Sequence, residues 1–457
     1  MKTWMTLIGL SLSLAGCGVS SEPEQTTDPI LGPQSQRAWP GGSLGGWTSA
    51  DGVRSVWSGR RDSAEMVGSG SDAGDWSEEF AEADARGGDE PSAAAPMDDS
   101  VMPNHPQGNA LEGGEVDDNE DYAEFLEYVS AARDRLGDDP AVEWLDVTER
   151  QYIRVVDSNG RHVPDATVII ASEGDDILGR TRANGDFAFF PAAYGTQLTG
   201  TALAWSPVGE GEALLDDEDT VIVLDGVRDE AQRVDVDVAF VIDATGSMSE
   251  EIARIKTTVT DIAAQISSSE GVGTLRFGLV DYRDRGDAYV THTVDFTDDI
   301  QAFESVVNTV QAGGGGDFPE ELNAALHETM RRLDWRRANT LRVAFVVADA
   351  PAHYYEQQEY TYANAMLDAA AMGVKVFPIA SGGSDPVAEL QFRQLAQFTQ
   401  GHFVFITEGQ GSTQGSGGST YDVDESQFQV ERLDALLVRL VSEEVEDWLR
   451  GVDLQFL

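Results

Sequence analysis

The stretch Val241-Ile-Asp-Ala-Thr-Gly-Ser-Met-Ser249 decides the fold, because a strand gives way to a helix within it. The apolar run Val236 to Ile242 predicts a buried strand, and the apolar spacing after the stretch predicts a helix over residues 249–266. The loop between them carries three oxygen-bearing side chains: Asp243, Thr245 and Ser247. Open α/β sheets bind ligands at this carboxyl edge, so the loop is a candidate binding site.

One carboxylate and two hydroxyls on one loop favour a hard divalent cation such as Mg²⁺, which prefers oxygen ligands. The alternative interpretation is a helix cap, in which Asp243 and the two hydroxyls bind the N–H groups of the first turn. Asp349 favours the metal, because it follows the apolar run Val343 to Ala348 and is therefore expected at the same sheet edge.

From Val234 onward, strand patterns alternate with helical patterns. Strands are expected over residues 236–242, 275–281, 289–296, 341–348, 374–380 and 402–406, and helices over residues 249–266, 300–310, 320–333, 362–372, 390–398 and 428–449. Such alternation predicts an α/β fold with a doubly wound, mostly parallel sheet over residues 229–457.

Three further motifs make this segment resemble a von Willebrand factor A domain. They are RFGLVDYRDRGD (276–287), AGGGGDFPEELNAAL (312–326) and VAFVVADAPAH (343–353), in that order after the Asp243 loop. The set is similar to the subgroup found in hemicentins and in the A domains attached to some α-kinases. The resemblance implies a Rossmann-like fold and a metal-ion-dependent adhesion site.

The resemblance also implies a second metal loop over Gly313–Asp317 and a third that ends at Asp349. Adhesion-type A domains usually carry a threonine in the second loop, but none lies between Gly313 and Glu320. Asp317 is assigned as its substitute, and Glu320 is a weaker candidate. The expected ligands of Mg²⁺, or of Mn²⁺ or Ca²⁺, are therefore Asp243, Thr245, Ser247, Asp317 and Asp349. The additional carboxylate is expected to tighten cation binding and to weaken the attraction for an acidic partner.

Other polar residues near this edge leave two interpretations open. Asp281, Asp284 and Asp287 follow the second strand, where they either shape the ligand face or are merely solvated. His353 lies four residues after Asp349 and either contacts a ligand or metal-bound water, or is a structural residue of the loop.

The N-terminus predicts where the protein resides. Lys2 precedes the short apolar run Met5 to Leu14, which is typical of a signal peptide rather than a membrane span. The ending Leu14-Ala-Gly-Cys17 resembles a bacterial lipobox, which implies a signal peptide over residues 1–17 and an acylated Cys17, the only cysteine. We expect a lipid-anchored protein of the bacterial cell envelope. The residue after the cysteine is Gly18 rather than Asp, which by resemblance to enterobacterial sorting favours the outer membrane.

The composition is strongly acidic, with 81 Asp and Glu against 30 Lys and Arg and a formal net charge of −51. Nucleic acid is therefore excluded as a partner, because its backbone needs cationic contacts. Residues 18–145 are rich in small and acidic residues and are expected to form a disordered acidic tether. Within this region, Asp121 to Leu136 has helical spacing and is expected to form a short helix.

Residues 147–228 predict a small all-β sandwich. Alternating apolar runs are separated by the tight-turn pairs Asn159-Gly160 and Asn184-Gly185. The sequence around these turns resembles the carboxypeptidase regulatory-like sandwich. Nothing in this segment looks catalytic. A spacer or an auxiliary binding module is the expected role.

Together these features predict a cation-dependent, protein-binding lipoprotein that serves adhesion or envelope assembly. Its partners would be the membrane, through the lipid anchor, and an unidentified protein that presents a carboxylate to the metal. No nucleophile–base pair stands out, so the protein is not expected to be an enzyme. The alternatives are a metal-dependent hydrolase and a passive scaffold with a structural metal site.

Overall fold

The computed structural model describes residues 111–172, 175–197, 200–215, 219–231, 233–407, 421–423 and 430–450. Cys17, the predicted signal peptide and most of the predicted tether lie outside these residues. Within the described ranges, no helix is both long and apolar enough to cross a membrane.

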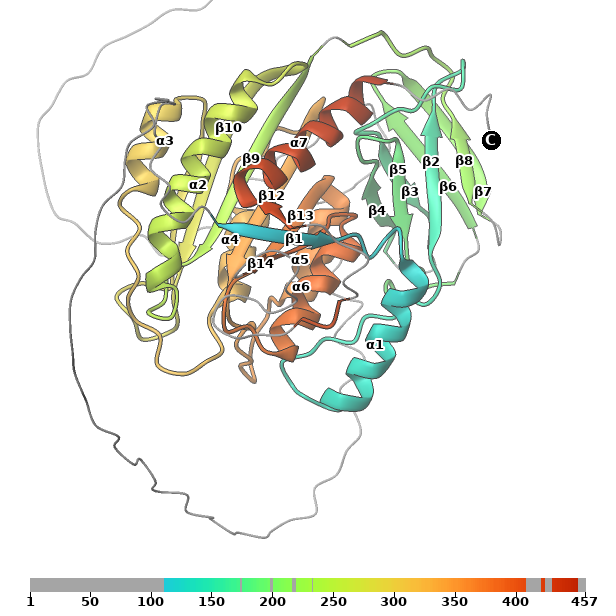
Figure 1. The fold of residues 1–457 in the computed structure, drawn as a ribbon. Helices are drawn as coiled ribbons and strands as arrows, with labels where there is room; N and C mark the ends of the chain where they lie inside the picture. Colours follow the sequence, from blue (N-terminus) through green and yellow to red (C-terminus); the bar gives the residue numbers. More distant parts are fainter. Residues whose placement is uncertain are drawn as a thin grey trace, which may run out of the picture. The chain divides into compact units, whose positions relative to one another are not determined.

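One eight-stranded sheet forms the centre of the structure, with the order β11-β10-β9-β12-β13-β14-β1-β15 (Figure 1). Its strands are β1 (Glu112–Val116), β9 (Val234–Asp243), β10 (Val272–Tyr282), β11 (Thr291–Thr297), β12 (Thr340–Ala348), β13 (Val374–Ala380), β14 (Phe403–Thr407) and β15 (Glu431–Arg432). Strands β10, β9, β12, β13 and β14 pair in parallel, whereas β11 and β1 run antiparallel to their neighbours. The predicted mostly parallel sheet is confirmed.

Helices cover both faces of this sheet. On one face lie α2 (Ser249–Ser268), α3 (Ile300–Val307) and α7 (Leu433–Arg450), and on the other lie α4 (Leu322–Arg331), α5 (Tyr362–Met372) and α6 (Pro386–Phe398). Successive residues of β9 point to opposite faces, so Val238 and Phe240 pack in one apolar cluster and Ala239 and Val241 in the other. Because both faces are covered, the middle of each central strand is apolar on both faces, as in residues 238–242 of β9 and 343–348 of β12.

The N-terminal end of the described chain belongs to this sheet. Strand β1 lies between β14 and β15, and helix α1 (Tyr122–Leu136) follows it and contacts α6. The predicted helix over Asp121–Leu136 is confirmed, but the predicted end of the tether at residue 145 is wrong. Glycines weaken a strand pattern and so hid β1 in the sequence. Gly113 fits because an added Cβ would lie 3.1 Å from the carbonyl oxygen of Phe405.

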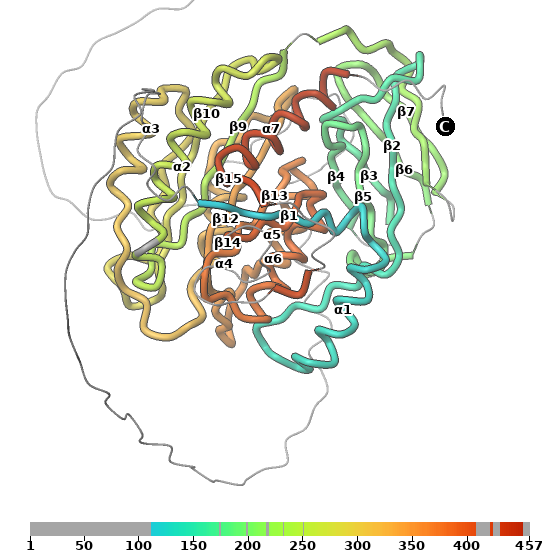
Figure 2. The backbone as a smooth tube through the Cα atoms, viewed as in Figure 1, coloured from blue at the N-terminus to red at the C-terminus, as the bar shows by residue number. Residues whose placement is uncertain are grey.

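A β-sandwich is inserted between α1 and β9, as the backbone trace in Figure 2 shows. Its two sheets have the orders β5-β2-β8 and β4-β3-β6-β7. The strands are β2 (Gln151–Val156), β3 (Thr167–Ile170), β4 (Ile177–Arg180), β5 (Asp186–Phe189), β6 (Gly200–Ser206), β7 (Gly209–Leu215) and β8 (Thr220–Val223). Gly160 and Gly185 take φ values of 82° and 80°, as the predicted tight turns require.

The sandwich and the α/β sheet share one hydrophobic core. Phe190 of the sandwich stacks on Phe398 of α6 with ring centroids 5.0 Å apart, and one cluster of buried residues spans both parts. The predicted boundary between residues 228 and 229 therefore does not separate two independent cores. A chain that began at Asp229 would lack both β1 and the sandwich side of this core.

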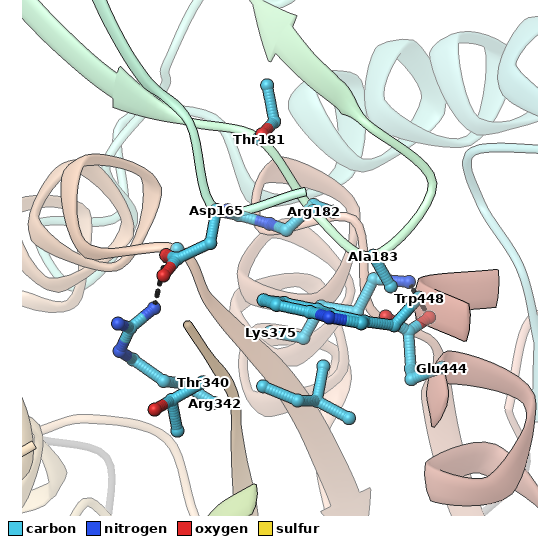
Figure 3. Close-up of a pocket in the computed structure, with 11 residues that line it drawn as sticks. Asp165, Thr181, Arg182, Ala183, Thr340, Arg342, Lys375, Glu444 and Trp448 are labelled. Atoms are coloured by element: carbon cyan, nitrogen blue, oxygen red, sulfur yellow. Dashed lines mark hydrogen bonds and ion pairs between the residues drawn. The ribbon is translucent and has the colours of Figure 1, made fainter. Parts of the chain in front are cut away.

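A buried ion-pair group lies at the same joint. Asp165 of the sandwich is 2.7 Å from Arg180 and 2.8 Å from Arg342 of β12. Figure 3 shows the carboxylate of Asp165 paired directly with the guanidinium of Arg342 in the lining of a small cavity. Burial would raise the pKa of Asp165, but the charges of Arg342 and Arg180 outweigh this effect and keep it below its ordinary value. The carboxylate therefore stays charged and links the two parts.

Replacement of Asp165 by Ala should lower the free energy of unfolding by about 3 kcal/mol or more, because two buried guanidinium groups lose their partner. Urea denaturation of the full chain measures the change. Glu446→Ala is the control, since its pair with Arg450 is exposed, and it should cost less than about 0.5 kcal/mol. Equal stability of the two variants would contradict the role of Asp165.

Candidate metal centre

Two carboxylates reach the same edge of the sheet from neighbouring strands. Asp243 is the last residue of β9, and Asp349 directly follows β12. Ile242 and Val347 are paired in the parallel register of these strands, so both chains turn away at the same level. The structure therefore brings these two predicted ligands to one place.

The Asp243 loop is fixed by hydrogen bonds within itself. Asp243 Oδ1 accepts from the backbone N of Thr245 at 2.9 Å and from its hydroxyl at 2.7 Å. The Thr245 hydroxyl is in turn 3.1 Å from the Ser247 hydroxyl. Helix α2 begins at Ser249 after Met248, with no side-chain cap, so Asp243 is not a helix cap. Its second oxygen, Oδ2, is buried and makes no hydrogen bond of normal geometry, although the buried hydroxyl of Tyr282 is near enough to lower the pKa of Asp243.

Burial and mutual repulsion disturb both carboxylates. Burial and the neighbouring charge of Asp349 raise the pKa of Asp243 to about 7. Burial also raises the pKa of Asp349, although the Ser247 hydroxyl opposes this change. Asp349 Oδ1 is buried without a hydrogen-bond partner. Two acids thus lie side by side with unpaired oxygens, which is costly unless a cation is present.

The glycine loop packs directly against the Asp243 loop. Gly313 N donates to the carbonyl of Ala244 at 3.0 Å, and Gly246 N donates to the carbonyl of Gly314 at 3.1 Å. Gly314 and Gly315 take φ values of 82° and 74°, a backbone conformation that other residues avoid. The predicted purpose of the glycines, close backbone approach, agrees with this geometry.

Glu320 is the third carboxylate of the group. It is 3% exposed, and its Oε2 has no hydrogen-bond partner. A Cβ added to Gly315 would lie 2.8 Å from Glu320 Oε1 and 3.4 Å from the Cβ of Thr245, which places Glu320 beside the Asp243 loop. Burial, and then the charge of Asp243, raise the pKa of Glu320 to about 8.

The structure does not bring Asp317 into this group. Its side chain is 59% exposed, and its Oδ2 lies 4.0 Å from Nε2 of His353. After contacting the Asp243 loop through Gly313 and Gly314, the chain turns at the two glycines with positive φ. It returns beside Asp349 at Glu320, whose N–H donates to the carbonyl of Pro351. Sequence reasoning ranked Glu320 second, because the path through four glycines is not set by a local pattern.

The residues present fit a hard divalent cation. The donors at this edge are all oxygens, and the three buried carboxylates of Asp243, Asp349 and Glu320 each carry an oxygen without a hydrogen-bond partner. Mg²⁺ binds such donors and keeps open positions for water or ligand. Ser247 is exposed, so the group opens to solvent on that side.

Comparison with known proteins identifies the class of domain. Residues 237–408 match the family model of the von Willebrand factor A domain. The chain therefore contains a von Willebrand factor A domain, a kind of domain that typically mediates protein–protein interaction.

Two curated proteins are similar to part of this chain. One is the "Alpha-protein kinase vwkA" of Dictyostelium discoideum, 31% identical over 119 residues, which are 26% of this chain and 19% of that protein. The other is the "Putative ariadne-like RING finger protein R811" of Acanthamoeba polyphaga mimivirus, 29% identical over 119 residues, which are 26% of this chain and 11% of that protein. The chain thus spans a fifth or less of each relative.

Glu320→Gln should weaken Mg²⁺ binding by at least about tenfold, because one of three unpaired carboxylates is lost. Asp317→Asn removes the same charge from the same loop and should leave Mg²⁺ affinity within about twofold, since its carboxylate lies outside the group. Isothermal titration calorimetry measures both variants. The opposite order of effects would restore Asp317 as the ligand.

The affinity for Mg²⁺ should fall as the pH decreases through about 8 and then about 7, where Glu320 and Asp243 take up protons. Folding raises the pKa values of these two carboxyl groups. The free energy of unfolding of the cation-free protein should therefore decrease as the pH rises above the ordinary carboxyl pKa. Calorimetric titrations at about pH 8.5 and 6.5 measure the effect. A constant Mg²⁺ affinity between these two pH values would contradict the prediction, because it would show that Mg²⁺ binding displaces no proton from Glu320 or Asp243.

Proposed function

We propose that the A domain binds a protein partner through a divalent cation held by Asp243, Ser247, Asp349 and Glu320. One observation carries the proposal: three buried carboxylates present unpaired oxygens beside an exposed hydroxyl at the open edge of the sheet. Metal dependence follows from the charge, because carboxylates without a counter-ion repel one another and also repel an acidic ligand.

Each residue has a distinct part in this binding. Thr245 is fully buried and fixes the orientation of Asp243 by two hydrogen bonds to Oδ1, which leaves Oδ2 free for the cation. Ser247 offers its hydroxyl on the solvent side. When bound, the cation supplies an electropositive centre that a carboxylate of the partner can complete.

Exposed apolar side chains flank the charged group. Phe318 is 43% exposed and Tyr354 is 40% exposed, each next to a polar residue of the same edge, Asp317 and His353 respectively. Buried aromatic anchors commonly dominate the energy of protein interfaces. We infer a partner that presents a carboxylate surrounded by apolar surface rather than an isolated acidic tail.

The proposed location rests on the N-terminal sequence. Cys17 ends the lipobox-like run, and the acylated residue would anchor the protein in the bacterial envelope, in the outer membrane. The partner would then be a periplasmic or surface protein. We propose a binding role without catalysis.

Envelope proteins captured by the immobilised full chain in Mg²⁺ should be released by chelator, and Asp243→Ala should capture none of them. Asp298→Ala is the matched control, because Asp298 is an exposed acid near the opposite edge of the sheet, next to β11, and should bind as the wild type does. Capture that survives both chelator and Asp243→Ala would refute cation-dependent binding. Mg²⁺-dependent phosphoester or ester hydrolysis by the same samples would favour the hydrolase.

Cys17→Ala should move the protein from the membrane fraction to the soluble fraction, because acylation needs the cysteine thiol. Fractionation in detergent-free buffer, followed by immunodetection, measures the distribution. Retention of the variant in the membrane fraction would show that something other than the lipid holds the protein there.

A further inference from the structure

A second group of ligand-type side chains lies beside the first. One ligand atom each of Asp284, Asp317 and His353 lies within 4.8 Å of the other two. His353 Nδ1 is 3.6 Å from Asp284 Oδ1, and its Nε2 is 4.0 Å from Asp317 Oδ2. None of the three takes part in the hydrogen bonds of the Asp243 loop.

Three separate loops meet at this group. Asp284 follows β10, Asp317 ends the glycine loop, and His353 lies between β12 and α5. Their convergence depends on the sheet topology and is not a run of neighbours in sequence.

The histidine is held in place on several sides. Its ring stacks on Tyr355 with centroids 4.2 Å apart, and its backbone N–H donates to the carbonyl of Glu320 at 2.8 Å. The carbonyl of His353 accepts from Asn323 at 3.2 Å. The hydroxyl of Tyr355 lies 3.0 Å from Asp284 Oδ1 and 3.1 Å from His353 Nδ1, which leaves Nε2 of the histidine for an ion. A side chain fixed this well suits a ligand that must keep one orientation.

The charge of this group is not balanced by its neighbours. Arg285 is paired with Glu321 at 2.6 Å and stacks over Tyr355 at 3.6 Å, and Arg283 donates to the carbonyl of Gln311. Among the described residues, the one ion pair of Asp317 is to His353.

Glu320, a member of the first group, is also acted on by the negative charge of this second group. This residue is 3% exposed, its Oε2 has no partner, and the negative charges of Asp284 and Asp287 act on it as well as that of Asp243. An unpaired, buried carboxylate oxygen thus lies within the influence of both groups, where positive charge is missing.

We propose that Asp284, Asp317 and His353 bind a second cation, of the transition-metal class that includes Zn²⁺, Co²⁺, Ni²⁺ and Mn²⁺. An imidazole nitrogen with two carboxylates suits these ions better than Mg²⁺, which favours oxygen ligands alone. Three protein ligands leave at least one position open to water or to a partner. The bound ion would join the glycine loop to His353 and so fix the exposed Phe318 next to Asp317.

This inference does not rest on the proposed partner binding. The first group is an all-oxygen site, and the second contains nitrogen, so the two can be filled separately. Saturating Mg²⁺ occupies the first site and leaves the second for a softer ion.

The test is a titration of the full chain with Co²⁺ in saturating Mg²⁺, followed by visible absorption and calorimetry. One equivalent should bind. His353→Phe keeps an aromatic ring against Tyr355, removes both nitrogens, and should weaken Co²⁺ binding by at least about tenfold. His292→Phe is the control, because His292 also faces an aspartate, with Nδ1 2.8 Å from Asp281 Oδ1, but lies outside the group.

Asp284→Asn should weaken Co²⁺ binding as His353→Phe does, and Asp243→Ala should leave it intact. Unchanged binding in His353→Phe, or an equal loss in His292→Phe, would overturn the proposal as adventitious binding to surface histidines. Loss of Co²⁺ binding in Asp243→Ala, with none in His353→Phe, would show that Co²⁺ only competes at the first site.

Discussion

Unbalanced negative charge at the carboxyl end of β9 is the interaction on which the function of this edge of the sheet depends. Asp243, Asp349 and Glu320 are buried, and each has an oxygen without a hydrogen-bond partner. Folding alone does not pair these groups, since the arginines of the neighbouring loop, Arg283 and Arg285, bind the carbonyl of Gln311 and the carboxylate of Glu321 instead. A divalent cation removes the repulsion and creates a centre that attracts a partner's carboxylate. Stability and recognition would then depend on the same ion.

The scaffold is built to hold that edge rigid. Backbone hydrogen bonds join the Asp243 loop to the glycine loop, and the parallel register of β9 and β12 sets Asp349 beside Asp243. At the other side of the sheet, β1 extends the strand order, and the sandwich packs into a common core through Phe190 and Phe398. The sandwich is therefore part of the support of the A domain as well as a connection to the N-terminal region.

Local pattern was sufficient where the structure depends on neighbours in sequence. The strand, loop and helix around Asp243 and the position of Asp349 were predicted from the sequence, because each follows directly from an apolar run. The choice between Asp317 and Glu320 was not determined in this way, since positive φ at Gly314 and Gly315 redirects the chain between them. Sequence assigned the metal role to Asp317, and the structure gives the buried position to Glu320.

Long-range partners were also beyond the sequence. Strand β1 contains two adjacent glycines and pairs with β14 across nearly the whole described chain, so it looked like part of a tether. The ion pair between Asp165 and Arg342 joins residues 177 positions apart, and no local feature connects them. The core shared by the two folded parts was not predicted for this reason, whereas the doubly wound α/β sheet and the β-sandwich were predicted from local pattern.

Thermal unfolding of the wild-type chain, with and without Mg²⁺ at matched ionic strength, tests the central claim most directly. A cation that binds only the folded state adds about 2.7 kcal/mol at roughly a hundredfold excess over its Kd. The melting temperature should therefore rise clearly in Mg²⁺ over that in chelator. Identical melting in chelator and in excess Mg²⁺ would contradict a cation site at the edge of β9.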